Sequence, residues 1–250
     1  DEINLIDPTS HTAGGGREFY SDMMNNQNNK KTISFDLQDV ITNQTANCKV
    51  DVAASSGEET SIQVNYANSD KNIRISRISV TDYHTKAVIG HTEINTTPTS
   101  TSTQTIDINM KSNAAGATAY INYIELNVPC SLVMRNNQLA ISNTAYLKNT
   151  NPIRYHLSNT NNNIQIWRVT NGVDITRMVT AYQDNILTWI DNNTRAEKYV
   201  AVDVSSRKWP SPKLVGTITN QNLHALENVD YVIICPQEFL APATRLAEKH

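Results

Sequence analysis

Hydrophobic and polar residues alternate along most of the chain between residues 31 and 130. Such alternation places successive side chains on opposite faces of a strand, one face buried and the other in water. The stretches that show it are TISFDL, CKVDVAA, SIQVNYA, IRISRISV, TIDINM and ATAYINYIELNV. Turn-forming sequences such as SSGEE and KSNAAG separate these stretches. The pattern predicts a mainly β fold, with short antiparallel strands in a jelly-roll-like sandwich of two sheets.

A second series of strand-like stretches fills residues 131–207. Its members are SLVM, QLAIS, IRYHLS, IQIWRVT, RMVTAY, ILTWID and KYVAVDVS, with Asn-rich turns between them. We predict a second, smaller, Ig-like sandwich here, and the alternative is that these strands complete the first one. Residues 1–30 carry glycine-rich and Asn-rich sequence and are expected to be a flexible segment, with GREFYSDMM as a candidate packed stretch. Residues 208–227 are expected to be a linker, because its prolines interrupt regular hydrogen bonding.

The last segment, residues 228–250, follows a different pattern. Its YVIIC stretch is apolar at every position, which predicts a strand buried on both faces. Pro236 ends that strand, and Pro242 suits the first turn of a helix on which Ala243 and Leu246 share one face. A strand followed by a helix is half of a βαβ unit and leaves one face of the strand uncovered. We therefore expect this segment to be the start of a truncated α/β domain, and the natural chain to continue beyond it.

The amino-acid composition bears on which kinds of partner the chain binds. Apolar residues make up 39% of the 250 residues, aromatic residues 6% and charged residues 18%, and the formal net charge is −3. Lys and Arg are scattered singly, so the sequence does not predict nucleic-acid binding. A membrane-spanning helix needs about 18 or more consecutive apolar residues, and the sequence contains no such run, so the chain is not expected to span a membrane.

The cysteines offer the first candidate chemistry. Cys48, Cys130 and Cys235 are widely spaced and odd in number, which is neither a disulfide framework nor zinc-ligand spacing. We expect buried free thiols, and a bridge between two of them is the open alternative. Cys235 ends the apolar stretch, where α/β folds place functional groups, but we expect a structural thiol there rather than a nucleophile.

Histidine and carboxylate candidates are weaker. His224 precedes the last segment and is expected either to bond a backbone carbonyl or to orient the linker against a further domain. The pairs Asp36 with Asp39 and Glu58 with Glu59 have the groups needed for acid–base work or for binding calcium on a loop. Neither pair has the spacing of a known calcium motif, so we expect both to be solvated.

The tryptophans raise a carbohydrate-binding alternative, since sugars stack on exposed aromatic rings. Trp167 and Trp189 lie within predicted strands and are expected to pack in the sheets. Trp209 stands next to Pro210, and we expect it to be exposed or covered by a further domain.

Several stretches resemble the gingipain-type cysteine peptidases, and in particular the branch that acts as the sortase of the type IX secretion system. VDYVIICPQEFLAPATRLAEKH resembles the opening strand and helix of the peptidase domain, and NQNLHAL resembles the approach to it. The upstream matches are TISFDL with CKVDVAASS, AGATAYINYIELNVPCSL, and IQIWRVTNGVDITRM followed by YVAVDVS. The resemblance runs over residues 15–250 and rests on the order and spacing of short motifs. Arg168 stands where the family has an acid.

The resemblance implies a division between this chain and the catalytic machinery. The family's catalytic Cys and His lie downstream of the opening strand, so no catalytic, cofactor-binding or metal-binding residue is assigned here and no cofactor is expected. The family cleaves the sorting signal from exported proteins and transfers the new terminus to a surface lipopolysaccharide-linked acceptor. The chain is then expected to be a non-catalytic, extracellular region at the outer membrane surface that positions the downstream peptidase domain or binds secretion partners or exported substrates. The alternative is a free-standing extracellular carbohydrate-binding or adhesin module.

Overall fold

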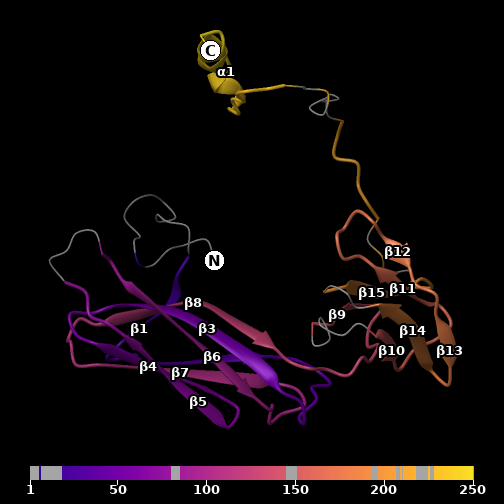
Figure 1. Ribbon diagram of the computed structural model, residues 1–250, viewed down its shortest axis with the longest axis horizontal. Helices are drawn as coiled ribbons and strands as arrows, with labels where there is room; N and C mark the ends of the chain where they lie inside the picture. The colour runs from indigo at the N-terminus through magenta and orange to yellow at the C-terminus, as the bar shows by residue number, and fades with distance from the viewer. Residues whose placement is uncertain are drawn as a thin grey trace. The chain divides into compact units, whose positions relative to one another are not determined.

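The computed structural model forms two compact units, Asp1–Ser206 and Arg207–His250 (Figure 1). All of the described strands lie in the first unit, and a short helix lies in the second, so the predicted mainly β fold is confirmed. No described helix is long and apolar enough to cross a bilayer. The structure describes residues 6, 19–79, 85–144, 151–192, 196–206, 209, 211–217, 225 and 228–249.

The first eight strands form the predicted jelly roll. One sheet has the order β1 (Ser21–Asn25), β8 (Thr118–Asn127), β3 (Ala46–Ser55) and β6 (Val88–Thr96). The other has the order β2 (Lys30–Phe35), β7 (Gln104–Ser112), β4 (Thr60–Tyr66) and β5 (Ser69–Ile75). Every pair of neighbouring strands is antiparallel, and the chain passes between the sheets at most of its turns, as in a double Greek key.

The core of this sandwich comes from the alternating positions found in the sequence. Val50 and Val52 of β3 face the opposite sheet, where Ile62, Val64 and Ile108 are also fully buried. Burying each such side chain contributes about 1.5–3 kcal/mol relative to leaving it in water. The alternation therefore fixes the register, because a slip by one residue would turn this whole set toward the solvent.

Two strands of the jelly roll were not predicted. β1 lies inside the segment expected to be flexible, at the end of GREFYSDMM, the stretch that was expected to pack; Met24 is fully buried there, and the strand pairs with β8. Its five residues, SDMMN, are too few to show a clear alternation and run into the Asn-rich stretch NNQNN, so the strand forms through its pairing with β8. β6 was missed because its inward positions include Gly90 and Thr92, which give almost no hydrophobic signal.

Gly90 is the point where the two sheets approach each other at one edge. A Cβ atom on this residue would lie 2.6 Å from Cγ2 of Ile73 and 2.9 Å from Cγ1 of Ile75. Both distances are shorter than real Cβ contacts, so β6 can lie this close to β5 only without a side chain here.

The later strands form the second, smaller sandwich, with a core of its own. Its three-stranded sheet has the order β10 (Pro152–Leu157), β14 (Ile186–Asn192) and β13 (Ala181–Gln183). Its four-stranded sheet has the order β12 (Thr176–Arg177), β11 (Ile164–Arg168), β15 (Lys198–Asp203) and β9 (Gln138–Ser142). The stretch RMVTAY, predicted as one strand, divides between β12 and β13, which belong to different sheets. The predicted strand SLVM forms only an isolated bridge between Val133 and Ser158.

Three aromatic rings fill the centre of the second sandwich. Tyr155 and Trp189 stack with ring centroids 4.9 Å apart. Tyr199 meets Trp189 edge-on at 5.7 Å and lies 5.4 Å from Tyr155. Such offset and edge contacts add about 0.5–1.5 kcal/mol each beyond the buried area. The rings come from three strands, so they join the two sheets of this sandwich.

The segment between the sandwiches is fixed at both ends by backbone and side-chain contacts. The backbone amide of Ser131 donates to the carbonyl of Asp39, and Nε of Arg135 donates to Oδ2 of Asp39 at 2.9 Å. Toward the second sandwich, the amide of Met134 donates to the carbonyl of Ser158 at 3.0 Å. The pair Asp39 and Arg135 thus ties this segment to the loop between β2 and β3.

The second unit corrects one prediction and confirms another. Tyr231–Cys235 was predicted to be a buried strand, but it is extended backbone that pairs with no described strand, and Ile234 is 94% exposed. A strand forms only where a neighbour supplies its hydrogen-bond partners, and no part of the described chain does so here. The helix is confirmed: a 3₁₀ turn, η2 (Gln237–Phe239), leads into α1 (Leu240–Ala247). It begins two residues before Pro242.

Candidate functional site

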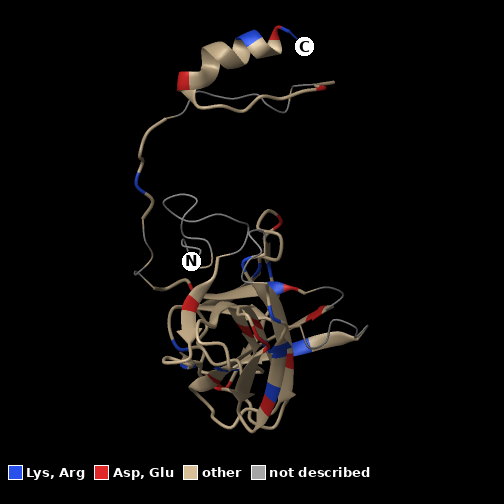
Figure 2. Cartoon of the chain, turned by 90° about the vertical axis from the view of Figure 1, so that its left-hand side faces the viewer, with Lys and Arg blue, Asp and Glu red and all other residues tan. Residues whose placement is uncertain are grey.

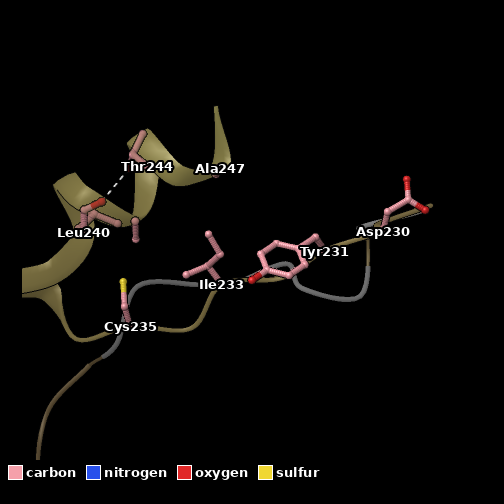
Figure 3. Close-up of a pocket in the computed structure, with 8 residues that line it drawn as sticks. Asp230, Tyr231, Ile233, Cys235, Leu240, Thr244 and Ala247 are labelled. Carbon is pink, nitrogen blue, oxygen red and sulfur yellow. Dashed lines mark hydrogen bonds between the residues drawn. The ribbon is translucent and has the colours of Figure 1, made fainter. Parts of the chain in front are cut away.

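The second unit contains a hollow between the extended segment and α1. It has a volume of about 620 Å³, and Figure 3 shows the side chains around it. The lining residues are Asp230, Tyr231, Ile233, Cys235, Leu240, Ala243, Thr244 and Ala247. Pro236 ends the extended segment, and its carbonyl accepts a hydrogen bond from the amide of Phe239 at 3.0 Å. This turn places α1 beside the segment and creates the hollow.

Most of the side chains that line the hollow are apolar, and further apolar side chains of the same two segments are exposed. Tyr231, Val232 and Ile234 of the extended segment and Leu240 and Leu246 of α1 are all exposed. The hydroxyl of Thr244 donates to the carbonyl of Leu240 at 2.9 Å, so its proton already has an acceptor within α1. Exposed apolar groups gathered in this way mark a surface that packs against other protein.

Cys235 is half-buried and lines this hollow. Nucleophilic catalysis by a thiol requires an adjacent base, usually an imidazole. None of the lining residues is a histidine, and His224 lies outside the described residues. A structural thiol at Cys235 stays our prediction.

The other two cysteines differ in environment. Cys48 is fully buried in the jelly-roll core, and burial raises the pKa of its thiol to about 11. Cys130 was also expected to be buried but is exposed, because it follows β8 on the surface segment between the sandwiches. Partial burial and the neighbouring Asp39 carboxylate both raise the pKa of its thiol. All three cysteines are free, so the alternative of a disulfide is not realised.

The candidate carboxylate pairs do not form a site. Asp36 accepts a hydrogen bond from Thr103 Oγ1 at 3.1 Å, while Asp39 pairs with Arg135 instead of lying free in solvent. Glu58 and Glu59 are exposed on the turn before β4. Within the described ranges, no three His, Cys, Asp or Glu side chains lie close enough together to hold a metal ion.

The tryptophans do not form an exposed platform. Trp189 is buried among the core aromatic rings, as expected, while Trp167 on β11 and Trp209 beyond β15 are each half-buried. Nε1 of Trp189 is buried without a hydrogen-bond partner among the described residues. A stacking site for sugars built from these rings is therefore not evident in the part of the chain that the structure describes.

A polar cluster that the sequence did not predict surrounds Asp191 at the end of β14. Its carboxylate accepts hydrogen bonds from Nη1 of Arg168 at 3.1 Å and from the hydroxyl of Tyr199 at 2.9 Å. Burial and this hydrogen bond to Asp191 raise the pKa of Tyr199 well above its usual range. Arg168, which departs from the family motif, thus has a structural partner 23 residues away, a separation at which sequence gives no signal.

Side chains of both charge signs lie on the described part of the chain. Figure 2 shows Lys and Arg interspersed with Asp and Glu over the strands in that view. This distribution agrees with the absence of a basic patch in the sequence.

Comparison with known proteins adds one strong likeness. No protein-family model matches the chain, and no curated protein matches it. The crystal structure of dimeric latent PorU from Porphyromonas gingivalis matches 93% of this chain with a TM-score of 0.74 at 19% sequence identity. The chain has the fold of that part of PorU. It spans 22% of the PorU chain.

Two further solved structures show only a weak likeness. TmCBM61 in complex with β-1,4-galactotriose matches 45% of this chain and 69% of its own, with a TM-score of 0.27 and 12% identity. A Paenibacillus sp. cycloisomaltooligosaccharide glucanotransferase complexed with cycloisomaltoheptaose matches 74% of this chain and 41% of its own, with a TM-score of 0.25 and 7% identity. Neither score supports an argument about fold or ligand. The resemblance predicted from the motifs is confirmed by PorU, at the level of fold.

Proposed function

We propose that this chain is the non-catalytic β-rich region of a PorU-like, gingipain-type cysteine peptidase of the type IX secretion system. The observation that carries the proposal is the match to PorU over 93% of the chain with a TM-score of 0.74. In this role the chain works outside the cell, at the outer membrane surface, and the peptidase chemistry belongs to another part of the protein.

The second unit is the proposed connection to the peptidase domain. Residues 228–250 would form the first strand and helix of that domain, with the two sandwiches and the linker at 208–227 before them. The exposed side chains of Tyr231, Val232 and Ile234 support this role, because a neighbouring layer of protein would cover them. The backbone of this segment would also obtain there the strand partner that it lacks among the described residues.

The sandwiches have a positioning role in this proposal. Their cores are complete, and each sandwich presents stable sheet faces to secretion proteins or to exported substrates. The chain contributes no residue to peptide-bond cleavage.

The test compares the isolated chain with the PorU-like protein that contains it. Residues 1–250 alone are expected to cleave no peptide, and the whole protein is expected to cleave peptides until a thiol-alkylating reagent inactivates it. Peptidase activity in residues 1–250 alone would refute the proposal.

A pair of substitutions tests the connection itself. In the whole protein, Ile234→Asp is expected to lower the melting temperature of the peptidase domain by several degrees, because it places a charge in the proposed packing. The matched control is Val215→Asp in the linker at residues 208–227. The native side chain there is 100% exposed, so we expect this change to leave the melting temperature unchanged. Equal melting temperatures for the two variants would contradict a packed role for residues 228–250.

A free-standing carbohydrate-binding or adhesin module is the other candidate, and no specific observation favours it. It predicts glycan binding by the isolated chain, which a glycan array measures.

A further inference from the structure

The second sandwich has a hollow on its outer face that the proposed function does not use. It has a volume of about 660 Å³ and lies over the three-stranded sheet of β10, β14 and β13. The inward side chains of this sheet, such as Leu187 and Trp189, fill the core, so the residues between them point outward. β10 lines the hollow with Arg154 and His156, and β14 lines it with Ile186, Thr188 and Ile190. The other side is lined by Val179, Thr180, Gln183 and Asp184. The Asp184 carboxylate lies at the turn next to Ile186, whereas Arg154 is opposite Ile190.

Three of the side chains that line the hollow on the side away from β10 are aliphatic and exposed. Val179 is 91% exposed, Ile190 52% and Ile186 39%. Single exposed aliphatic residues are ordinary on protein surfaces, but three around one hollow form a patch that binding would remove from water. The opposite rim is formed by β10, whose Arg154 pairs with Ile190 and whose His156 pairs with Thr188.

The β10 rim carries donors without an acidic partner. The side chain of Arg154 makes no hydrogen bond or ion pair with any residue that the structure describes, whereas Arg135 and Arg168 each hold an aspartate. Nδ1 of His156 lies 3.3 Å from Oγ1 of Thr188, so Nε2 is the ring nitrogen left for a ligand. A guanidinium with an imidazole two residues away on the same face of a strand is suited to hold a carboxylate.

We propose that this hollow binds an extended peptide segment of a partner protein, with an acidic side chain at one end and aliphatic side chains at alternate positions after it. Side chains two residues apart in an extended peptide are separated by about 6.8 Å, and the sheet is about 10 Å across its three strands. Five residues extend over about 14 Å, so they cross all three strands with the first, third and fifth side chains facing the sheet. The carboxylate binds Arg154 and His156, the first aliphatic side chain covers Ile190, and the second contacts Val179. This inference does not depend on the proposed role of the second unit.

The probe is an array of synthetic pentapeptides with the pattern acidic–Ser–aliphatic–Ser–aliphatic, each amidated at the C-terminus. The binding of the purified 250-residue chain to each peptide is measured. Each peptide has a matched partner in which Gln replaces Glu, or Asn replaces Asp. The acidic peptides are expected to bind at least about tenfold more tightly than their amide partners, since a hydrogen bond to a charged group is lost in the latter. Added salt is expected to weaken the binding of the acidic peptides.

Variants of the chain distinguish binding at this site from non-specific binding of peptides. Arg154→Ala is expected to remove the preference for acidic peptides, and Ile190→Asp is expected to abolish binding of both sets. The control is Arg74→Ala, which removes an exposed arginine from β5 in the other sandwich and is expected to leave binding unchanged. Circular dichroism and thermal melting show that each variant is folded. If no peptide binds, if amide and acidic peptides bind equally, or if Arg154→Ala and Arg74→Ala behave alike, the proposal is wrong.

Discussion

At the scale of single residues, several charged groups among the described residues have partners far away in sequence. Asp39 holds Arg135, Asp191 holds Arg168 and Tyr199, and composition alone predicts none of these pairs. Sequence reasoning treated Asp39 as a solvated loop residue and Arg168 only as a departure from a motif. Both readings missed the pairing because it depends on which strands become neighbours.

The cluster around Asp191 leads to a stability prediction. Asp191→Asn keeps the shape but weakens the hydrogen bonds from Arg168 and Tyr199, so we expect the free energy of unfolding to fall by about 2 kcal/mol. Denaturant titration followed by tryptophan fluorescence measures it, since Trp189 lies in the same sandwich. Asp70→Asn on the exposed face of β5 is the control, with an expected change within about 0.5 kcal/mol. A similar loss in both variants would argue against a structural role for the cluster.

A second residue-scale prediction concerns alkaline pH. Burial raises the pKa of Cys48 from 9.0 to about 11, and burial together with Cys48 raises that of Tyr66 to about 12. Above pH 9 the unfolded chain therefore loses these protons before the folded chain does. The stability that Cys48 contributes is fully present below about pH 9 and is lost as the pH rises through about 11, and that of Tyr66 is lost between about pH 10 and 12.

Unfolding titrations at a series of alkaline pH values measure this loss. Cys48→Ala is expected to flatten the decline, by up to about 2 kcal/mol across the range, while Cys130→Ala on the exposed segment is expected to reduce it less. Identical slopes in the two variants would show that the buried thiol does not titrate in this way.

At the scale of elements, the alternation in β3, β4 and β7 was sufficient to predict strands because one face of each is packed in the core. β1 and β6 escaped prediction because their strand character comes from pairing and not from their own side chains. The opposite error occurred at Tyr231–Cys235, where apolar residues predicted a strand that no described neighbour pairs with. The candidate site was predictable only in outline: its apolar character follows from sequence, whereas the hollow depends on the turn after Pro236.

The approach of β5 and β6 gives a prediction at this scale. Gly90→Ala is expected to lower the free energy of unfolding by about 1–3 kcal/mol, because the added methyl group would overlap Ile73 and Ile75. Gly116→Ala is a matched control, since a Cβ there meets nothing within 4 Å, and we expect it to be neutral or slightly stabilising. Thermal melting of the two variants decides the matter, and equal melting temperatures would contradict the close approach.

At the scale of the whole molecule, the chain divides into a packed part and a part with little packing of its own. The first unit contains both cores, while Leu214 and Val215 of the second unit are exposed on a connector without regular structure. Sequence composition predicted a linker in this region from its prolines. The composition did not show how few contacts the linker makes with the rest of the chain.

This division predicts where a protease cuts. Brief digestion with trypsin is expected to cleave at Lys213 before any strand, and to leave a fragment that contains the first unit with its cooperative melting intact. Intact mass identifies the fragment, and circular dichroism measures its melting. First cleavage within the strands, or loss of a cooperative transition after cleavage at Lys213, would show that the connector is held by contacts essential to the fold.

The pairing of β1 with β8 has a practical consequence. The strand that opens the jelly roll and the strand that closes it are antiparallel neighbours, with Ser21 opposite Ile121 and Asn25 opposite Thr118. The polypeptide therefore enters and leaves this sandwich at the same edge of one sheet. Because both ends lie at this edge, the jelly roll is suited to insertion into a surface loop of another protein, with a short linker to bridge the six residues by which β8 continues beyond Ile121.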